Sequence, residues 1–283
     1  MPWLIFVVAF AVRLVHIWQI KPSPFFDVLL GDARGYDEWA RRLAGGDWIG
    51  TEVFYQAPLY PYYLGVLYKL LGHDLLIVRI CQAAIGSASC ALLALAGERF
   101  FSKRVGLIAG LALALYAPAI FFDGIVQKAS LTCLLVCALF AAVSWYGTTS
   151  QGTERELEKQ QARRLRSGFG NELLGALVIG VLGGLLSITR ENAMVWIPIL
   201  GVWAWAETPK RRNAETQKTE TPKHRNAETP KHGNEPRSDE ATLRNCSGQA
   251  PPRSGGRNRR WAAVGAYVLG VAIVLVLAFD KAV

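Results

Sequence analysis

The sequence predicts an all-α, polytopic membrane protein with about seven transmembrane helices and with in-plane helices in its first external loop. Its 283 residues are 52% hydrophobic and only 19% charged, which leaves too little polar surface for an ordinary soluble domain. The apolar residues gather in runs of about twenty, the length that crosses a hydrocarbon core as a helix. Lys and Arg collect between particular runs, as they do in the cytoplasmic loops of membrane proteins.

Seven apolar runs are candidates for these helices. In chain order they are Trp3 to Ile20, Leu75 to Gly97, Val105 to Phe122, Ala129 to Gly147, Leu173 to Thr189, Ala193 to Ala206 and Trp261 to Phe279. The first run has no basic segment before it and contains Arg13 and His16, so we expect a retained anchor rather than a cleaved signal peptide. The sixth run is short, and Pro198 predicts a kink or an earlier start.

The basic segments between the runs assign a side of the membrane to each loop. Those predicted to be cytoplasmic are 98–104, 148–171 and 207–260. We place the N-terminus inside as well, and the runs then alternate across the membrane. The segments predicted to face the outside are 21–74, 123–128, 190–192 and the C-terminus.

The chain divides into a predicted transmembrane core at 1–206, a linker at 207–260 and a final helix at 261–283. The core carries the cytoplasmic insert at 148–171. The linker repeats Glu-Thr-Pro-Lys and is almost free of aliphatic residues, which predicts a disordered, basic cytoplasmic segment. We expect a solvated spacer, and binding to anionic lipid or to a cytosolic partner is the alternative.

The first external loop is predicted to contain two helices. Residues 31–43 have helical spacing before a Gly45-Gly46 stop, so an interfacial helix is expected to open near Asp32. The Asp32 carboxylate is then either the cap of that helix or a group aimed into a cavity. Residues 57–72 contain four Tyr and two Pro and reach only about 22 Å as a helix, so we expect them in the plane of the outer leaflet.

Ionisable residues occur at the predicted outer ends of several spans. Charge near lipid is costly unless it is paired or used. A carboxylate that takes a proton from a hydroxyl, beside Lys or Arg that stabilises a departing phosphate, suits a transfer reaction. For each residue alone the alternative is a helix-end anchor that reaches into water. The residues are Asp32, Arg79, Asp123, Lys128 and Arg190.

Four short elements occur in a characteristic order. They are Gly31-Asp32-Ala33-x-x-Tyr36 before a Trp-Ala helix, Gln56-Ala57-Pro58-Leu59-Tyr60-Pro61, Val78-Arg79 opening a small-residue span, and Leu-Ser-Ile-Thr189-Arg190-Glu191-Asn192-Ala193. In this order, residues 1–206 resemble the N-terminal half of bacterial membrane glycosyltransferases of the GT-C class. Within that class the chain is similar to glycosyltransferase family 39, which is related to the protein O-mannosyltransferases and the lipid A aminoarabinose transferases.

The resemblance implies inverting transfer of a sugar from a polyprenyl-phosphate donor to an acceptor hydroxyl on the outer face of the bacterial inner membrane. It implies Asp32 as the general base and Arg190 as the residue that holds the donor phosphate. Since a departing phosphate needs cations, Lys128 or Arg79 is expected to help Arg190 hold it. Asp123 or Lys128 falls loosely where the family has a second polar, often acidic, residue. Aromatic candidates for the wall of the sugar or prenyl groove, with interface anchoring as their alternative role, are Tyr36, Trp39, Tyr60 and Tyr62.

The chain departs from the family pattern in two ways. Many members have Asp-Glu where this chain has Asp32-Ala33, and members continue for several hundred residues where this chain has one further span. The alternative is therefore a truncated, inactive paralogue that binds lipid-linked sugar or a partner, such as a subunit that supplies the missing C-terminal half. A small transporter is a weaker alternative, since the charges cluster at the outer ends and not at the midplane.

Other functional classes lack their sequence signatures. The net charge of +9 resides mainly in polar inserts and not on a face with base-stacking aromatics, so no nucleic-acid partner is expected. The five Cys show no Cys-x-x-Cys spacing, and neither a phosphate-binding loop nor His-Glu-x-x-His occurs. No cofactor is predicted. The scattered carboxylates define no metal ligand set, so dependence on a divalent metal is left open.

Overall fold

A computed structural model describes residues 2–24, 26–48, 56–148, 157–202 and 255–279. Within these ranges the chain is mostly helical and contains no β-strand. The elements are α1 (Pro2–Ile20), α2 (Asp32–Ala44), α3 (Leu59–Leu71), α4 (Leu75–Phe100), α5 (Lys103–Ala114), α6 (Ala117–Asp123), α7 (Ala129–Thr148), α8 (Leu157–Thr189), the 3-10 helix η1 (Glu191–Val195) and α10 (Gly255–Phe279). A short helix over residues 196–202 follows η1.

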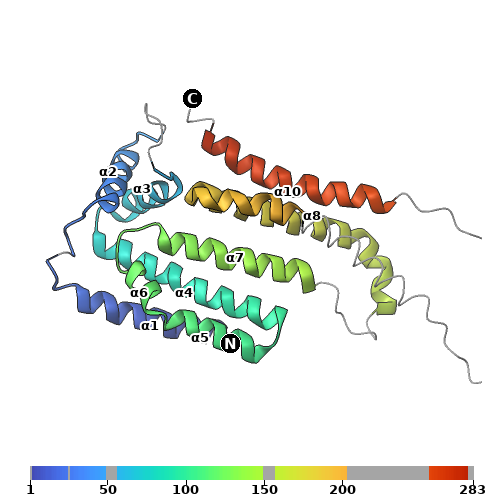
Figure 1. Ribbon diagram of the computed structural model, residues 1–283, viewed down its shortest axis with the longest axis horizontal. Helices are drawn as coiled ribbons and strands as arrows, with labels where there is room; N and C mark the ends of the chain where they lie inside the picture. The colour runs from blue at the N-terminus through green and yellow to red at the C-terminus, as the bar shows by residue number, and fades with distance from the viewer. Residues whose placement is uncertain (1, 25, 49–55, 149–156, 203–254, 280–283) are drawn as a thin grey trace, which may run out of the picture.

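The long helices lie side by side, and α2 and α3 gather at one end of them (Figure 1). α4 packs against α1, α5 and α7, while α8 packs against α7 and α10. The starts of α4 and α7 and the end of α8 all lie at the end that carries α2 and α3 (Figure 1). Segments that are far apart in the sequence therefore meet at this end of the bundle.

Two helices, α1 and α4, are long and apolar enough to cross a membrane. The bent pair of α5 and α6 makes a third candidate if it counts as one span. The other apolar helical segments among the described residues are shorter, with 10–17 residues. These segments are Ala129–Trp145, Leu173–Thr189, Asn192–Val202 and Trp261–Leu275. The helical, apolar character of the chain is confirmed, and the prediction of about seven spans is not.

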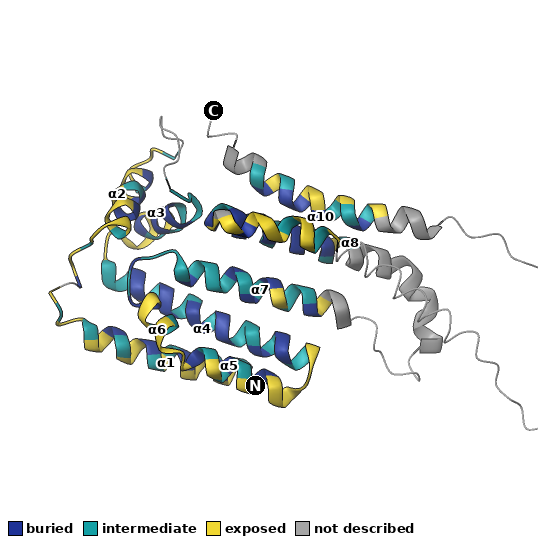
Figure 2. Cartoon of the chain, in the orientation of Figure 1, coloured by how far each residue is buried: buried dark blue, intermediate teal, exposed yellow. Residues whose placement is uncertain are grey.

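The outward faces of α1 and α5 are exposed, whereas the enclosed α4 carries most of its exposed positions at its two ends (Figure 2). Apart from Gln19 near its end, the exposed side chains on α1 are apolar, and Trp3 and Trp18 are 70% and 74% exposed. Large apolar surface of this kind is unfavourable in water. The pattern is compatible with helices that face lipid.

The third predicted run, Val105 to Phe122, is not one helix. It forms α5 and α6, which are bent by 55° relative to each other. The physical reason is Pro118, which has no N–H to donate to the Ala114 carbonyl one turn earlier. Arg13 of α1 donates to that carbonyl instead, with 3.5 Å between Nη1 and O. The break between α5 and α6 is therefore stabilised by α1, which packs against both helices.

Both helices predicted within residues 21–74 are confirmed. α2 begins at Asp32, directly after Gly31 with a φ of 58°, and ends before Gly45. Its buried positions Tyr36, Ala40 and Leu43 recur at the spacing of one helical face. They pack on α3, whose Gly65 approaches Leu43 so closely that an added Cβ would lie 2.8 Å from the Leu43 Cβ. The two helices thus form one compact pair.

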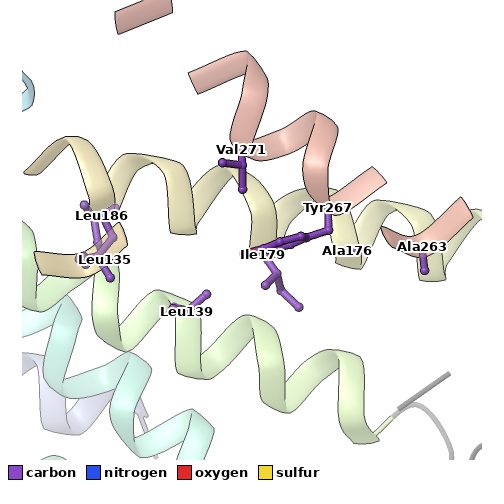
Figure 3. Close-up of a cluster of buried hydrophobic side chains, with 9 residues drawn as sticks. Leu135, Leu139, Ala176, Ile179, Leu186, Ala263, Tyr267 and Val271 are labelled. Atoms are coloured by element: carbon purple, nitrogen blue, oxygen red, sulfur yellow. The ribbon is translucent and has the colours of Figure 1, made fainter. Parts of the chain in front are cut away.

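A buried apolar cluster joins α7, α8 and α10. It contains Leu135 and Leu139 from α7, Ala176, Ile179 and Leu186 from α8, and Ala263, Tyr267 and Val271 from α10 (Figure 3). α8 and α10 approach at their backbones, since a Cβ added at Gly270 would lie 2.6 Å from the Leu177 carbonyl oxygen. The Tyr267 hydroxyl donates to the Ile197 carbonyl oxygen over 2.8 Å, which ties the chain after η1 to this pair.

Two helices begin before the apolar runs that predicted them, and a third run does not begin as an α-helix. α8 begins at Leu157, inside the predicted cytoplasmic insert, and α10 begins at Gly255, inside the predicted disordered linker. Once an apolar helix has formed, adding polar residues to its end costs little, so helices extend past the apolar run. The predicted sixth run starts as the 3-10 helix η1. The rest of the predicted linker, residues 207–254, lies outside the described residues.

Candidate functional site

The predicted base, Asp32, is the first residue of α2. Its side chain does not cap the helix, because the N-cap position is Gly31. The carboxylate is exposed and accepts a hydrogen bond from Gln56 Nε2 at 3.1 Å. The positive end of the helix dipole favours a negative charge in this turn. Asp32 is therefore presented at the surface and held by one side-chain contact.

Tyr36 lies one turn after Asp32, on the same face of α2. The residue is only 1% exposed, and its ring meets the ring of Tyr60 edge to face, with 5.0 Å between centroids. Burial raises the pKa of the Tyr36 hydroxyl, the negative charge of Asp32 raises it further, and the positive charge of Arg190 opposes both. The two residues are far apart in the sequence, and both influence the pKa of this one hydroxyl.

The contact of α3 with α8 explains how Arg190 comes near α2. Leu59, the first residue of α3, packs against the apolar cluster that contains Leu186 and Ala193. Arg190 stands between these two residues, directly after the end of α8, and its side chain is exposed. Its backbone amide still donates to the Leu186 carbonyl at 2.9 Å. Arg190 thus has a fixed backbone and an exposed guanidinium.

Tyr60 supports this arrangement from the interior and does not line a surface groove. It is fully buried, and its hydroxyl donates to Gln82 Oε1 of α4 at 3.1 Å. Gln82 Nε2 in turn donates to the Ile125 carbonyl at 2.8 Å and to Ser130 Oγ at 3.3 Å. Burial raises the pKa of Tyr60 well above its ordinary value, so this hydroxyl stays a donor. This series of hydrogen bonds links α3 and α4 to Ile125, which precedes α7, and to Ser130 at the start of α7.

Arg79 is not available to a phosphate in this structure. The residue is 3% exposed, and its guanidinium donates to backbone carbonyls of Gly124 at 2.9 Å, Phe26 at 2.5 Å and Leu75 at 3.2 Å. It also stacks on the Phe26 ring, with 3.8 Å from Cζ to the ring centroid. Arg79 holds the two predicted external loops to α4, because its donors are directed at their carbonyl oxygens.

Asp123 is also turned inward. Its Oδ2 lies 2.6 Å from Nε of Arg13 in a pair that is almost completely buried. Arg13 donates as well to the Ala9 carbonyl at 3.2 Å. Gly86 of α4 makes room for the pair, since an added Cβ would collide with the Asp123 carboxylate. The predicted second polar residue of the site is therefore an internal partner of α1.

The remaining predicted residues lie at the same end of the molecule. Lys128 directly precedes α7 and is half-buried, and its carbonyl accepts from the Thr132 hydroxyl at 2.9 Å. The rings of Trp39 and Tyr62 lie 6.3 Å apart, and Tyr62 also donates from its hydroxyl to the Trp48 carbonyl at 2.8 Å. The four predicted groove aromatics therefore divide into an inner pair, Tyr36 with Tyr60, and an outer cluster around Trp48.

Sequence reasoning missed Asp37 as a buried carboxylate. It is 1% exposed and accepts from the Tyr68 hydroxyl at 2.6 Å, while His73 Nε2 lies at 2.8 Å and Arg41 completes an ion pair. Burial by itself raises the pKa of Asp37, but the hydrogen bonds from Tyr68, His73 and Arg41 reverse this, and the pKa lies below its ordinary value. The i, i+4 spacing of Asp37 and Arg41 was the one signal in the sequence.

The chain matches no protein-family model, no curated protein and no solved structure. Among the described residues, no three His, Cys, Asp or Glu side chains form a group that could hold a metal ion. The class that the fold defines is a helical protein with apolar helices fit for a membrane. Its candidate site is the end of the bundle that carries Asp32, at the start of α2, and Arg190, directly after α8 (Figure 1).

Proposed function

We propose that the protein is an integral membrane glycosyltransferase of the GT-C class, which moves a sugar from a polyprenyl-phosphate donor to an acceptor hydroxyl. One observation carries the proposal. The exposed Asp32 at the start of α2 and the exposed Arg190 just after α8 come from distant parts of the chain and lie at the same end of an apolar helical bundle (Figure 1). A general base and a phosphate ligand are the two groups that this reaction requires.

In the proposed reaction, Asp32 takes the proton of the acceptor hydroxyl as its oxygen attacks the anomeric carbon of the donor sugar. The bond between that carbon and the phosphate oxygen breaks, and its electron pair leaves with the lipid phosphate. Arg190 stabilises the charge on the departing phosphate through hydrogen bonds to its oxygens. Attack opposite to the leaving group inverts the anomeric centre. Lys128 is a second cation for the phosphate, and Trp39 and Tyr62 belong to the outer wall of the groove.

The proposal includes a topology. It has about seven spans in a bacterial inner membrane, a cytoplasmic N-terminus, and α2 and α3 on the extracytoplasmic side. The shorter apolar helices then cross the membrane together with neighbouring residues. In support of this, α2 and α3 lie at the opposite end of the bundle from the basic turn between α4 and α5 (Figure 1).

A second candidate, an inactive paralogue that binds lipid-linked sugar or a partner subunit, is favoured by two observations. Asp123, the second predicted acid, is paired with Arg13, and Ala33 stands where many GT-C members have a second acid. Saturable binding of a prenyl phosphate without sugar transfer by the intact protein selects this candidate.

The test of the proposed function is sugar transfer by the full chain in membranes. Membranes are incubated with labelled polyprenyl-phosphate sugars, and release of lipid phosphate is measured. We expect release with the wild type and at least a hundredfold lower rate with Asp32→Asn, in line with the roughly 10²–10⁴-fold contribution of a general base. The exposed Glu38→Gln on the same helix is the matched control. Equal rates for wild type and Asp32→Asn refute the base assignment.

A further inference from the structure

Positive charge gathers at the end of the bundle opposite to α2 and α3. α4 ends there, α5 begins there, and α7 ends beside them (Figure 1). α5 opens with Lys103 and Arg104, which are both exposed, and Arg99 lies in the last turn of α4. α10 begins at the same end, and its first six residues include three Arg (Figure 1). Three helices therefore bring cations to this end of the molecule.

The cations of α4 and α5 are not balanced by neighbouring acids. Glu98 is the one acidic residue in the segment 98–104. Within the ranges that the structure describes, neither Glu98 nor any other carboxylate forms an ion pair with these three cations. On α2, by contrast, Arg34 and Arg41 each pair with a carboxylate of the same helix. The basic end of the bundle therefore attracts an anion from outside the chain.

Exposed aromatic rings adjoin the cations. Arg99 lies over the ring of Trp145, near the end of α7, with 4.8 Å from Cζ to the ring centroid, and the Trp145 side chain is exposed. Phe101, in the turn between α4 and α5, is 77% exposed. Aromatic rings beside Lys and Arg are typical of the level at which a membrane meets water. This end of the bundle is therefore suited to lie among lipid headgroups.

α5 continues this surface along the side of the bundle. The exposed Leu107 follows Lys103 by four residues, and the exposed Ile108 follows Arg104 by four residues. Residues at this spacing lie one above the other on a helix. Each cation of α5 thus has an exposed apolar side chain one turn further along the helix, away from the basic end.

The apolar side chains distinguish between two kinds of anion. A soluble anion would contact the cations and leave Leu107 and Ile108 in water, which is unfavourable. A phospholipid has its phosphate and its acyl chains in one molecule, so both parts of the surface are satisfied together. Lys and Arg near a membrane also favour anionic lipids over neutral ones. The combination of charge and apolar surface therefore fits an anionic phospholipid.

We infer that this end of the bundle binds an anionic phospholipid, with Lys103 and Arg104 at its phosphate and with its acyl chains along Leu107 and Ile108. Arg99, held over the Trp145 ring, adds a third cation at the level of the headgroup. The inference goes beyond the proposed function. It requires that the protein lies in a membrane, but it requires neither sugar transfer nor a particular side of the membrane for this end.

The test measures lipid retention by the purified full chain. The protein is exchanged into mild detergent with equal amounts of phosphatidylglycerol and phosphatidylcholine that have the same acyl chains, and the lipids that remain after washing are measured by mass spectrometry. We expect the wild type to retain phosphatidylglycerol in preference. Lys103→Gln combined with Arg104→Gln should lower the ratio of the two lipids at least fivefold, about the contribution of one cation beside anionic lipid.

Two matched variants accompany this double substitution. Lys103→Arg combined with Arg104→Lys keeps both charges and should keep the wild-type ratio. Lys21→Gln combined with Arg42→Gln removes the same charge from exposed positions outside the basic end and should also leave the ratio unchanged. Glycerol phosphate, which has the phosphate but no acyl chains, serves as a competitor and should not displace the lipid at equal concentration.

Four results overturn the inference. The first is equal retention of the two lipids by the wild type, and the second is a wild-type ratio in the Lys103→Gln, Arg104→Gln variant. An equal fall in one of the two matched variants would assign the effect to local structure or to total charge. Displacement by glycerol phosphate at equal concentration would identify a site for a free anion. None of these results depends on sugar transfer, so the proposed function is tested separately.

Discussion

The charged residues around α2 fall into two groups with different surroundings. Asp32 and Arg190 are exposed, and each has few contacts that restrain its side chain. Asp37 and Asp123 are buried, and each carboxylate is paired: Asp37 with Tyr68, His73 and Arg41, and Asp123 with Arg13. A buried ion pair is costly to break, because the remaining charge is left without a partner, whereas exposed charges remain free to bind. The exposed Asp32 and Arg190 are therefore suited to chemistry, and the buried Asp37 and Asp123 to a structural role.

Charge reversal at Arg190 tests the first group. We expect Arg190→Glu to weaken binding of a polyprenyl-phosphate sugar by about ten- to hundredfold, because a charge-assisted hydrogen bond is worth about 1.5–3 kcal/mol. Membrane insertion should not change, since the side chain is exposed. Arg42→Glu, at another exposed cation on α2, is the control. Wild-type affinity in Arg190→Glu would remove this residue from the proposed site.

Neutralising Asp37 tests the second group. Asp37→Asn leaves Tyr68 and His73 without a charged acceptor, and we expect it to destabilise the protein by about 1–3 kcal/mol. Because the folded pKa of Asp37 is depressed, the stabilisation is fully present above the unfolded value of about 3.9 and is lost as the pH falls through the lower folded value.

Thermal unfolding of the wild type and of Asp37→Asn at neutral pH measures the destabilisation. The same measurement between about pH 4 and pH 2 measures the loss of the stabilisation on acidification. Glu38→Gln, whose ion pair with Arg34 is exposed, should change stability little. An Asp37→Asn variant as stable as the wild type at neutral pH contradicts the role of this carboxylate.

At the scale of the elements, the break between α5 and α6 is stabilised by a residue of another helix. Pro118 leaves the Ala114 carbonyl without its helical partner, and Arg13 supplies a donor while it pairs with Asp123. In a low-dielectric interior the two charges depend on each other. The bend of α6 in turn fixes Gly124 and Ile125, whose carbonyls accept from Arg79 and Gln82. The ion pair therefore positions the segment behind the candidate site.

Single and double substitutions test this coupling. Removing one partner with Arg13→Met or Asp123→Leu leaves an unpaired buried charge, and we expect a loss of about 3–5 kcal/mol. The double variant leaves no charge and should recover most of that loss, apart from about 1 kcal/mol for the Ala114 carbonyl. Chemical denaturation in mild detergent measures the free energy of unfolding of the two single variants and the double variant. A double variant whose loss equals the sum of the single losses would show that the two residues act independently.

For the whole molecule, the sequence was sufficient wherever a local pattern determined the structure. The helical spacing around Tyr36 and the glycines after Leu43 and Leu71 predicted α2 and α3 closely. Contacts between distant segments were not predictable, because Arg13 and Asp123 become partners only when α1 packs beside α6. Arg79 has the positive charge that a phosphate ligand needs. Its guanidinium instead donates to backbone carbonyl oxygens at positions 26, 75 and 124.

The orientation of the whole bundle is open to a direct test. We expect Asp27→Cys to react with a membrane-impermeant maleimide in intact spheroplasts, and Lys103→Cys to react only after lysis, because the two exposed residues are predicted on opposite sides. The wild type, with its native cysteines, gives the background for each condition. Labelling of both positions from the same side would contradict the proposed topology.

The close approach of α8 and α10 affects how the gene can vary. Glycines at positions 180, 184 and 270 leave no room for a larger side chain between the two helices. α10 therefore packs on α8 through shape complementarity. Nothing in these contacts depends on the number of residues between the helices. Insertions and deletions of Glu-Thr-Pro-Lys units can therefore accumulate during evolution without disrupting the packing of α10 on α8.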